Sequence, residues 1–363
     1  MAAINPALRI GKRVLRILMI VLIGLIGLLV LLSATHHIST AFEKMRNPAP
    51  GMMVTVHGEK MHVFTQGSGD NTFVVLSGGG VGEPVLEYKP LWSRLANHGQ
   101  VAVVEYFGYG WSETTDAPRT AENVVEETRE ALKLAGVQPP YILVPHSMSG
   151  IYAMTYAQAH RDELKAVIAL DTTLPRGLLK AWEQGDSMPT VGILPLIRNA
   201  GILRAALWLN PLLVSGAPEG TYSMEDTRLI ATVTGWNYGN QTLENEYKAI
   251  EGNMEALLDV GFPVDLPVLM IQAAPPDRLG ETYEWSLKER IRLTKDLDHG
   301  KVVELPAGHS GIYWQLSDRI VEETLQFLNE AKELRTRRGS RSHGKRAALL
   351  FGRDITGSPR SPP

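Results

Sequence analysis

The feature that most constrains this chain is the stretch YILVPHSMSG at positions 141–150. Apolar, β-favouring residues lead directly into Ser147, and a helix-compatible segment with small residues follows at once. This order predicts a strand, a sharp turn and a helix, with the turn lifting the serine hydroxyl out at the carboxyl end of the strand. Ser147 is therefore a candidate nucleophile. A serine in an ordinary strand-to-helix turn is the alternative interpretation.

The turn departs from the common G-x-S-x-G pattern. Pro145 stands where the first glycine would be, Ser149 stands where the second would be, and Gly150 follows. Small residues are favoured at these positions because the strand and helix backbones nearly touch there. Proline is not small, so the departure makes the motif less specific.

Short apolar runs alternate with helical patterns along most of the chain. A hairpin is predicted at 53–65, and buried strands are predicted at 73–76, 101–104, 141–144, 166–170, 268–272 and 301–305. Residues 120–135 and 317–332 have the apolar spacing of amphipathic helices. Strands that alternate with helices indicate an α/β fold with a mainly parallel central sheet flanked by helices.

Residues 17–34 form a long apolar run without a charge. A helix over this run would rise about 27 Å, close to the hydrocarbon thickness of a bilayer. Four basic residues precede it: Arg9, Lys12, Arg13 and Arg16. This flank predicts a single-pass anchor in the cell membrane, with the rest of the chain outside the cytoplasm. A cleaved signal peptide, which would give a secreted chain starting near Thr35, is the alternative.

Four parts are expected along the chain. Residues 1–35 would form the cytoplasmic flank and transmembrane anchor, 36–51 a linker, 52–332 one α/β domain, and 333–363 a disordered basic tail. The excess of arginine and lysine in the tail suits contact with anionic lipid or a cell-wall polymer. A tail that is merely solvated is the alternative.

Composition excludes several kinds of site. The net charge of −3 is too small to indicate a nucleic-acid partner. Because the chain has no cysteine, it can have no disulfide, thiol nucleophile or thiolate metal site. A phosphate-binding loop is disfavoured because no Gly-Lys-Ser/Thr sequence follows Gly80. No metal site and no cofactor are expected.

Three further segments accompany the serine turn. VVLSGGG occupies positions 74–80, EYFGYGWS occupies 105–112, and Gly308-His309 lies near the end of the domain. In order and spacing these segments resemble the α/β-hydrolase superfamily over residues 52–332. The resemblance is closest to its membrane-anchored bacterial serine hydrolases of the esterase and lipase kind. It implies the α/β-hydrolase fold, with a helical lid inserted at about residues 174–262.

The same resemblance implies roles for the site residues. Ser147 would be the nucleophile and His309 the base that takes its proton. The backbone N–H groups of Met148 and Gly79 would form the oxyanion hole. His146 is an alternative base, but its side chain should point away from the hydroxyl of its neighbour Ser147.

The acid that orients the histidine is a choice between two aspartates. Asp277 follows the strand predicted at 268–272, but it stands one residue later than the superfamily pattern and behind two prolines. Asp171 ends the strand predicted at 166–170, from which a carboxylate reaches the histidine in some members of the superfamily. Either aspartate could reach the histidine, because the two strands are expected to be neighbours. Asp277 is the first choice and Asp171 the alternative.

The resemblance implies cleavage of small-molecule carboxylic esters, and of amides in second place, through an acyl-enzyme. The lid would shape an apolar substrate pocket, and segment 105–112 is interpreted as scaffold near the mouth of the site. A catalytically silent binding protein on the same fold is one alternative. The other is an aminopeptidase of the proline-iminopeptidase kind, in which acidic lid residues hold the amino group of the substrate. The candidates for that role are Glu183, Asp186, Glu244 and Glu246.

Overall fold

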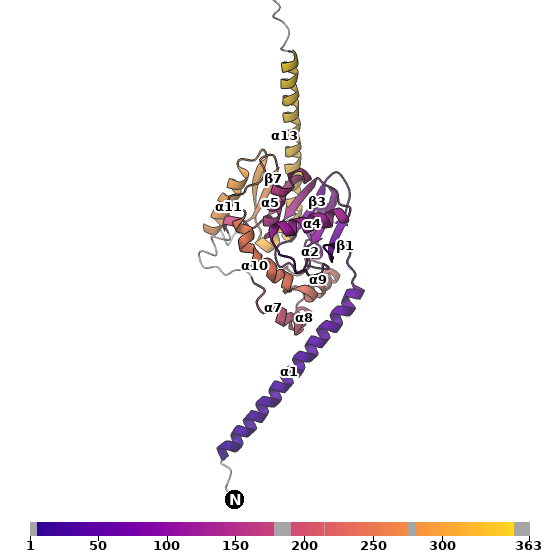
Figure 1. The fold of residues 1–363 in the computed structure, drawn as a ribbon, viewed down its shortest axis with the longest axis vertical. Helices are drawn as coiled ribbons and strands as arrows, with labels where there is room; N and C mark the ends of the chain where they lie inside the picture. The colour runs from indigo at the N-terminus through magenta and orange to yellow at the C-terminus, as the bar shows by residue number, and fades with distance from the viewer. Residues whose placement is uncertain (1–5, 178–189, 214, 275–280, 352–363) are drawn as a thin grey trace, which may run out of the picture.

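The computed structural model of the chain describes residues 6–177, 190–213, 215–274 and 281–351. A long helix, α1 (Pro6–Arg46), leads into an α/β domain built on one sheet (Figure 1). The strands of this sheet are β1 (Met52–Val56), β2 (Glu59–Gln66), β3 (Thr72–Leu76), β4 (Gln100–Glu105), β5 (Tyr141–Pro145), β6 (Leu164–Leu170), β7 (Val268–Ala273) and β8 (Gly300–Leu305).

Helices connect most of the strands. In chain order they are α2 (Pro84–Glu87), α3 (Lys89–Leu95), α4 (Ala121–Leu134), α5 (Ser149–Ala159), α7 (Leu194–Asn199), α8 (Ile202–Leu209), α9 (Met224–Asn237), α10 (Gln241–Glu255), α11 (Glu281–Thr294), α12 (Ile312–Gln315) and α13 (Ser317–Phe351). Two short 3₁₀ helices, η1 (Arg161–Glu163) and η2 (His309–Gly311), precede β6 and α12.

The sheet has the order β1-β2-β4-β3-β5-β6-β7-β8. The pairs β1–β2 and β2–β4 are antiparallel, and every pair from β4 to β8 is parallel. This confirms the predicted fold class, with a hairpin followed by a mainly parallel sheet. The carboxyl ends of the parallel strands meet at one edge, which is where ligands bind in open α/β sheets.

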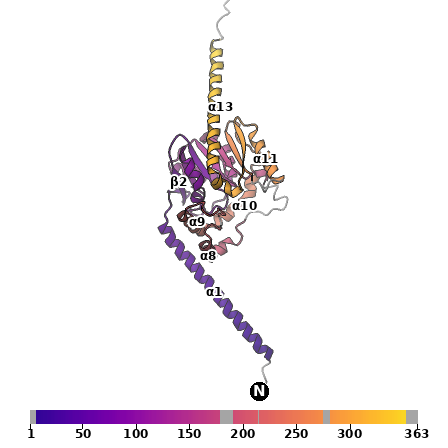
Figure 2. The same ribbon diagram turned by 180° about the vertical axis from the view of Figure 1, so that it is seen from behind.

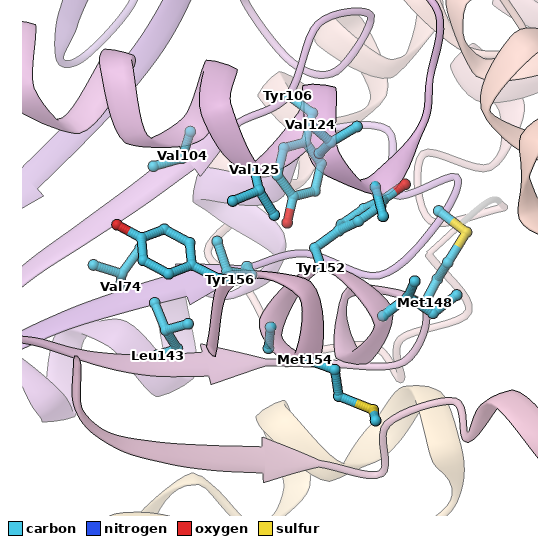
Figure 3. Close-up of a cluster of buried hydrophobic side chains, with 14 of the residues drawn as sticks. Val74, Val104, Tyr106, Val124, Val125, Leu143, Met148, Tyr152, Met154 and Tyr156 are labelled. Atoms are coloured by element: carbon cyan, nitrogen blue, oxygen red, sulfur yellow. The ribbon is translucent and has the colours of Figure 1, made fainter. Parts of the chain in front are cut away.

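Alternate residues of the central strands point to opposite faces of the sheet. On one face Val74 packs with side chains of α4 and α5, and Figure 3 shows part of this core. On the other face Phe73 and Val75 pack with side chains of α3 and α13. Because both faces are covered, the central strands read as continuous apolar runs in the sequence.

Helices α7, α8, α9 and α10 lie between β6 and β7, where the lid was expected, and residues 178–189 and 214 of this insertion lie outside the described residues. Glu246 of α10 is buried and accepts hydrogen bonds from the hydroxyls of Tyr109 (2.6 Å) and Tyr152 (2.5 Å). Burial raises the pKa of Glu246, although the two tyrosines act against the rise. This buried contact fixes the lid to the sheet domain.

Helix α1 continues to Arg46, so residues 36–46 of the expected linker are helical. That stretch has no proline or glycine, and the helix ends just before Pro48, where proline cannot continue it. Within the described part of the chain, Gly11–Arg46 is the one helix long and apolar enough to cross a membrane, and its most apolar stretch is not buried against the domain.

Helix α13 runs to Phe351, so the expectation of a disordered tail was wrong for residues 333–351. The next proline after this helix begins is Pro359, and arginine, lysine, alanine and leucine are good helix formers. Arg337 also pairs with Glu333 one turn earlier, at 3.5 Å. Residues 352–363 lie outside the described residues. The helix leaves the domain at the end opposite to α1, as Figures 1 and 2 show.

Candidate active site

Ser147 lies in the turn between β5 and α5 with a positive φ of 54°. A side chain in this left-handed region costs energy, so the surrounding structure must hold it. The N–H of Ser147 donates to the carbonyl of Leu170 (3.3 Å), and the carbonyl of Ser147 accepts from the N–H of Thr173 (2.8 Å). The turn is therefore clamped to the end of β6, as expected for a serine presented at the sheet edge.

The small residues of the motif have distinct roles. A Cβ at Gly150 would lie 2.5 Å from the Cβ of Thr172, so only glycine fits this close approach. Ser149 is buried, and its hydroxyl donates to the carbonyl of Leu76 (2.8 Å) while accepting from the N–H of His146 (2.9 Å). The serine at position 149 thus ties the turn to β3, which a glycine could not do.

His309 lies between Ser147 and Asp171. Its Nε2 is 2.8 Å from the Oγ of Ser147, and its Nδ1 is 2.6 Å from Oδ2 of Asp171. Ser147 follows β5, Asp171 follows β6 and His309 follows β8, so all three come from the carboxyl edge of the sheet. A histidine bonded in this way can take a proton from a serine while a carboxylate holds its other nitrogen.

This geometry corrects the preference for Asp277 as the carboxylate beside His309. Asp171 occupies Nδ1 and Ser147 occupies Nε2, so both ring nitrogens are engaged. The physical reason lies in the strand order: β6 is the neighbour of β5, and a positive φ of 39° turns Asp171 back at the end of β6. Asp277 itself lies outside the described residues.

The carboxylate of Asp171 is held on its other oxygen as well. Its Oδ1 accepts from the N–H of Ala273 and from Nη2 of Arg290, each at 3.1 Å. Burial alone would raise the pKa of Asp171, but the hydrogen bond with His309 and the charge of Arg290 outweigh it and lower the pKa. Asp171 is therefore a carboxylate at neutral pH.

Arg290 was not identified from the sequence. It lies on α11 with a side chain 3% exposed, and the same Nη2 also donates to the carbonyl of Thr172 (2.9 Å). It shares a buried helix face with Leu293 and Thr294. The signal that could have found it is a charged residue at a position where the helical pattern requires an apolar one.

The glycine loop packs against the turn of Ser147. A Cβ at Gly79 would lie 2.8 Å from Cε of Met148. The N–H of Gly78 donates to the hydroxyl of Tyr88 (2.9 Å) and that of Gly80 to the hydroxyl of Tyr109 (3.1 Å).

Among the described residues, no acceptor is bonded to the N–H of Gly79 or of Met148. These are the two groups expected to form the oxyanion hole, and they are available to an oxyanion. Ser77, which precedes the glycines, is buried, and its hydroxyl has no partner within the described part of the chain.

His146 joins the glycine loop to the loop of His309. Its Nε2 is 3.1 Å from the carbonyl of His309, which can only accept, so Nε2 carries the proton. Its Nδ1, at 2.7 Å, then accepts from the hydroxyl of Tyr88. Burial, and next the nearby charge of His309, lower the pKa of His146 to about 3. The ring is neutral and engaged at both nitrogens, in line with the expectation that it turns away from the serine hydroxyl.

Segment 105–112 has the structure of a scaffold. The buried carboxylate of Glu105 accepts from the N–H of Trp111 (2.7 Å) and lies 2.9 Å from Nδ1 of His62. Gly110 has a φ of 49°, and a Cβ there would overlap the carboxylate of Glu105. These contacts shape the loop without directing a reactive group toward Ser147.

Within the described ranges, no three side chains of histidine, aspartate or glutamate are grouped in a way that could hold a metal ion. We identify no cofactor-binding residue near Ser147.

A mainly parallel sheet that presents an in-line serine, histidine and aspartate at its carboxyl edge is the architecture of an α/β hydrolase. Residues 72–315 match the family model described as alpha/beta hydrolase fold, and the chain belongs to this family.

Two proteins of Bacillus subtilis are similar in sequence. The uncharacterized protein YbdG is 31% identical over 301 residues, which cover 82% of this chain and 91% of YbdG. The uncharacterized protein YqjL is 29% identical over 121 residues, which cover 33% of this chain and 47% of YqjL.

Solved structures share the fold at low identity. A candidate epoxide hydrolase from Pseudomonas aeruginosa aligns with a TM-score of 0.60 at 17% identity, covering 78% of this chain and 96% of that one. An epoxide hydrolase from Vigna radiata aligns with a TM-score of 0.56 at 20% identity, covering 76% of this chain and 97% of that one. At these identities the likeness shows the fold alone.

The contact between Arg290 and Asp171 predicts that Arg290→Met lowers kcat by about tenfold or more, with little change in KM, because the carboxylate loses its cation. Arg290→Lys should retain part of the activity, since it keeps the charge. The matched control is Arg292→Met on the same helix, whose partner is Glu289 at 2.6 Å. Steady-state kinetics that were equal for Arg290→Met and Arg292→Met would contradict this role.

Burial of neutral His146 predicts a loss of stability in acid. Its pKa falls from 6.5 to about 3 in the folded chain, so the unfolded chain binds the extra proton between these values. The contribution of neutral His146 to the free energy of unfolding is complete above pH 6.5 and is lost as the pH falls toward 3. Between pH 7 and pH 4, Tm should therefore fall less for His146→Asn than for the unmodified chain.

The matched control for this experiment is His57→Asn. The side chain of His57 is exposed, and asparagine tolerates its positive φ of 51°. This variant should keep the pH dependence of the unmodified chain. An equal fall of Tm in the His146 variant and the unmodified chain would refute the assignment.

Proposed function

We propose that this protein is a serine hydrolase that cleaves carboxylic esters through an acyl-enzyme. The observation that carries the proposal is the line from Ser147 through His309 to Asp171, with separations of 2.8 Å and 2.6 Å. A serine hydroxyl is a weak nucleophile at neutral pH and needs a base that is itself oriented. Both requirements are met at one edge of the sheet.

In the first half of the reaction, Oγ of Ser147 attacks the ester carbonyl and its proton passes to Nε2 of His309. Asp171 stabilises the imidazolium that forms. The N–H groups of Met148 and Gly79 donate hydrogen bonds to the carbonyl oxygen as it becomes negatively charged. His309 then gives the proton to the departing alcohol, which leaves the acyl group on Ser147.

In the second half, water attacks the acyl group while His309 takes its proton. The tetrahedral oxyanion again meets the N–H groups of Met148 and Gly79. When it collapses, the carboxylic acid departs and the proton returns from His309 to Oγ of Ser147. Water and ester are consumed, acid and alcohol are released, and no cofactor takes part.

The solved neighbours include epoxide hydrolases, and the chemistry of Ser147 argues against that activity here. If a serine oxygen opened an epoxide, the intermediate would be an ether, which a histidine-activated water does not cleave. An acyl group on the same oxygen is an ester, which that water does cleave. Ser147 therefore favours acyl transfer over epoxide opening.

The aminopeptidase alternative requires acidic lid residues that are free to hold an amino group. Glu246 is buried between two tyrosine hydroxyls. Glu244 accepts from the N–H of Val191 (3.1 Å) and pairs with Lys248 (3.3 Å). Glu183 and Asp186 lie outside the described residues. Glu246 is thus bonded to the sheet domain and Glu244 to residues of the lid, so neither is free, which favours the esterase.

The silent binding protein was considered because the elbow is altered, Ser77 precedes the glycines and the first-choice acid is displaced. The reasons that concern the elbow and the acid weaken, because Asp171 lies beside His309 and Ser149 ties the turn to β3.

We propose in addition that α1 anchors the chain in the cell membrane, with the basic flank before residue 17 in the cytoplasm and the hydrolase outside it. A secreted chain cleaved near Thr35 is the competing possibility.

The proposal predicts that Ser147→Ala loses ester hydrolysis by several orders of magnitude. The variant should still fold, because alanine removes one hydroxyl and keeps the backbone of the turn. Hydrolysis of a series of short to long acyl esters and labelling by a fluorophosphonate measure the loss. Undiminished fluorophosphonate labelling of the variant would refute Ser147 as nucleophile.

The two aspartates give a second prediction. Asp171→Asn should lower kcat by about 10²- to 10⁴-fold with little effect on substrate binding, because the imidazolium loses its carboxylate. Asp277→Asn is the matched control and should keep most of the activity. The reverse result in the same kinetic assay would restore Asp277 as the acid.

A further inference from the structure

The lid is bonded directly to the part of α1 that follows its apolar run. Arg204 of α8 donates to Oγ1 of Thr40 (2.7 Å), Oε1 of Glu43 (2.5 Å) and Nδ1 of His36 (3.3 Å). Oε2 of Glu43 accepts from the indole of Trp236 on α9 (2.9 Å). The helix and the lid therefore share a polar interface at residues 36–43.

This interface continues up to the apolar run of α1. Gly201, just before α8, has a φ of 75°, and a Cβ there would lie 2.4 Å from the carbonyl of Leu32. Leu32 belongs to the uncharged run 17–34. The start of α8 thus lies level with the outer end of the segment proposed to cross the membrane.

The lid presents large apolar side chains that the domain does not bury. On α8, Leu203 and Leu207 face inward, whereas Trp208 is 83% exposed and Leu209 is 79% exposed. On α7, Leu196 is 72% exposed. Helices α7 and α8 contact each other, and we call the exposed apolar residues on these helices and at the start of α7 the lid face: Ile193, Leu196, Ile202, Trp208 and Leu209. Grouped exposed apolar side chains mark a surface that binds something.

The lid face and α1 lie on the same side of the domain. In Figures 1 and 2, α7 and α8 lie at the end of the domain from which α1 extends, and α13 extends from the opposite end. Trp208 also lines a surface hollow with the exposed Arg228, beside Glu43 of α1. Tryptophan and arginine are residues that settle at the headgroup level of a bilayer.

We propose that the lid face rests on the phospholipid leaflet into which α1 inserts. Moving apolar side chains of this size from water into the acyl region of a bilayer is favourable, and partial insertion contributes less than full burial. Because α1 already holds the lid beside the leaflet, the contact is intramolecular in effect and a small gain per residue is sufficient. The inference rests on α1 being embedded in the bilayer, and it does not depend on the reaction at Ser147.

Because the chain has no cysteine, single cysteines can report the surroundings of chosen positions. The test uses the full chain in vesicles of phosphatidylethanolamine and phosphatidylglycerol, labelled with an environment-sensitive fluorophore at Leu196→Cys or Trp208→Cys. A nitroxide quencher is carried by the lipids. Both labels should emit at shorter wavelength than in water and lose most of their emission to the quencher.

Two matched controls frame the result. Leu134→Cys replaces an exposed apolar residue at the end of α4, next to the amino-terminal edge of the sheet, and should emit as in water. Leu25→Cys, in the apolar run of α1, should be quenched by nitroxides placed deep in the acyl chains. Far-UV circular dichroism confirms that each variant is folded.

The outcomes separate the possible occupants of the lid face. Quenching at 25, 196 and 208 but not at 134 supports the proposal. Shorter-wavelength emission at 196 and 208 without lipid quenching means that another copy of the chain covers the lid face, and overturns it. Water-like emission at both lid positions overturns it as well, and an unquenched label at Leu25 removes its premise.

Discussion

The strained turn at Ser147 depends on its hydrogen bonds with the end of β6, and the site depends on that turn. A left-handed conformation at a residue other than glycine costs about 1–2 kcal/mol, so it persists only where contacts fix it. The bonds to Leu170 and Thr173 lie on either side of Asp171. The clamp that holds the serine therefore also holds the carboxylate at the distance that His309 spans.

Much of the fold and part of the site could be predicted from the sequence. The strands follow from apolar runs bounded by turn residues, and Ser147 and His309 follow from local motifs at strand ends. The choice of acid could not be predicted, because it depends on a positive φ at Asp171 and on Arg290, which lies 119 positions away on α11. No local pattern contains that contact.

The ends of the two long helices were misjudged for a related reason. Residues 36–46 and 333–351 were interpreted as parts of a linker and a tail, although neither of these two stretches contains a proline that would stop a helix. Arg204 of the lid, which lies far away in the sequence, binds Thr40 and Glu43 in this part of α1. Composition indicates which side chains need water, but it does not by itself say whether the backbone that carries them is helical.

Buried polar groups join the layers of this protein where apolar packing alone would permit sliding. Glu246 joins α10 to Tyr109 and Tyr152. Glu105 fixes the loop before α4, and Arg290 fixes α11 to the end of β6. Such groups are costly to bury unless paired, so each specifies one arrangement of the elements it connects.

The hydrogen bonds of His146 have a consequence for when the site forms during folding. They join loops that the chain supplies near residues 78, 146 and 309, and 163 positions separate His146 from the carbonyl that it binds. Contacts between such distant residues form late, because the loop between them must close first. A chain still being synthesised, or one cut before β8, contains Ser147 but lacks His309, to which its hydroxyl is bonded. The arrangement of Ser147, His309 and Asp171 is therefore complete only after the final strand has been made, long after α1 has left the ribosome.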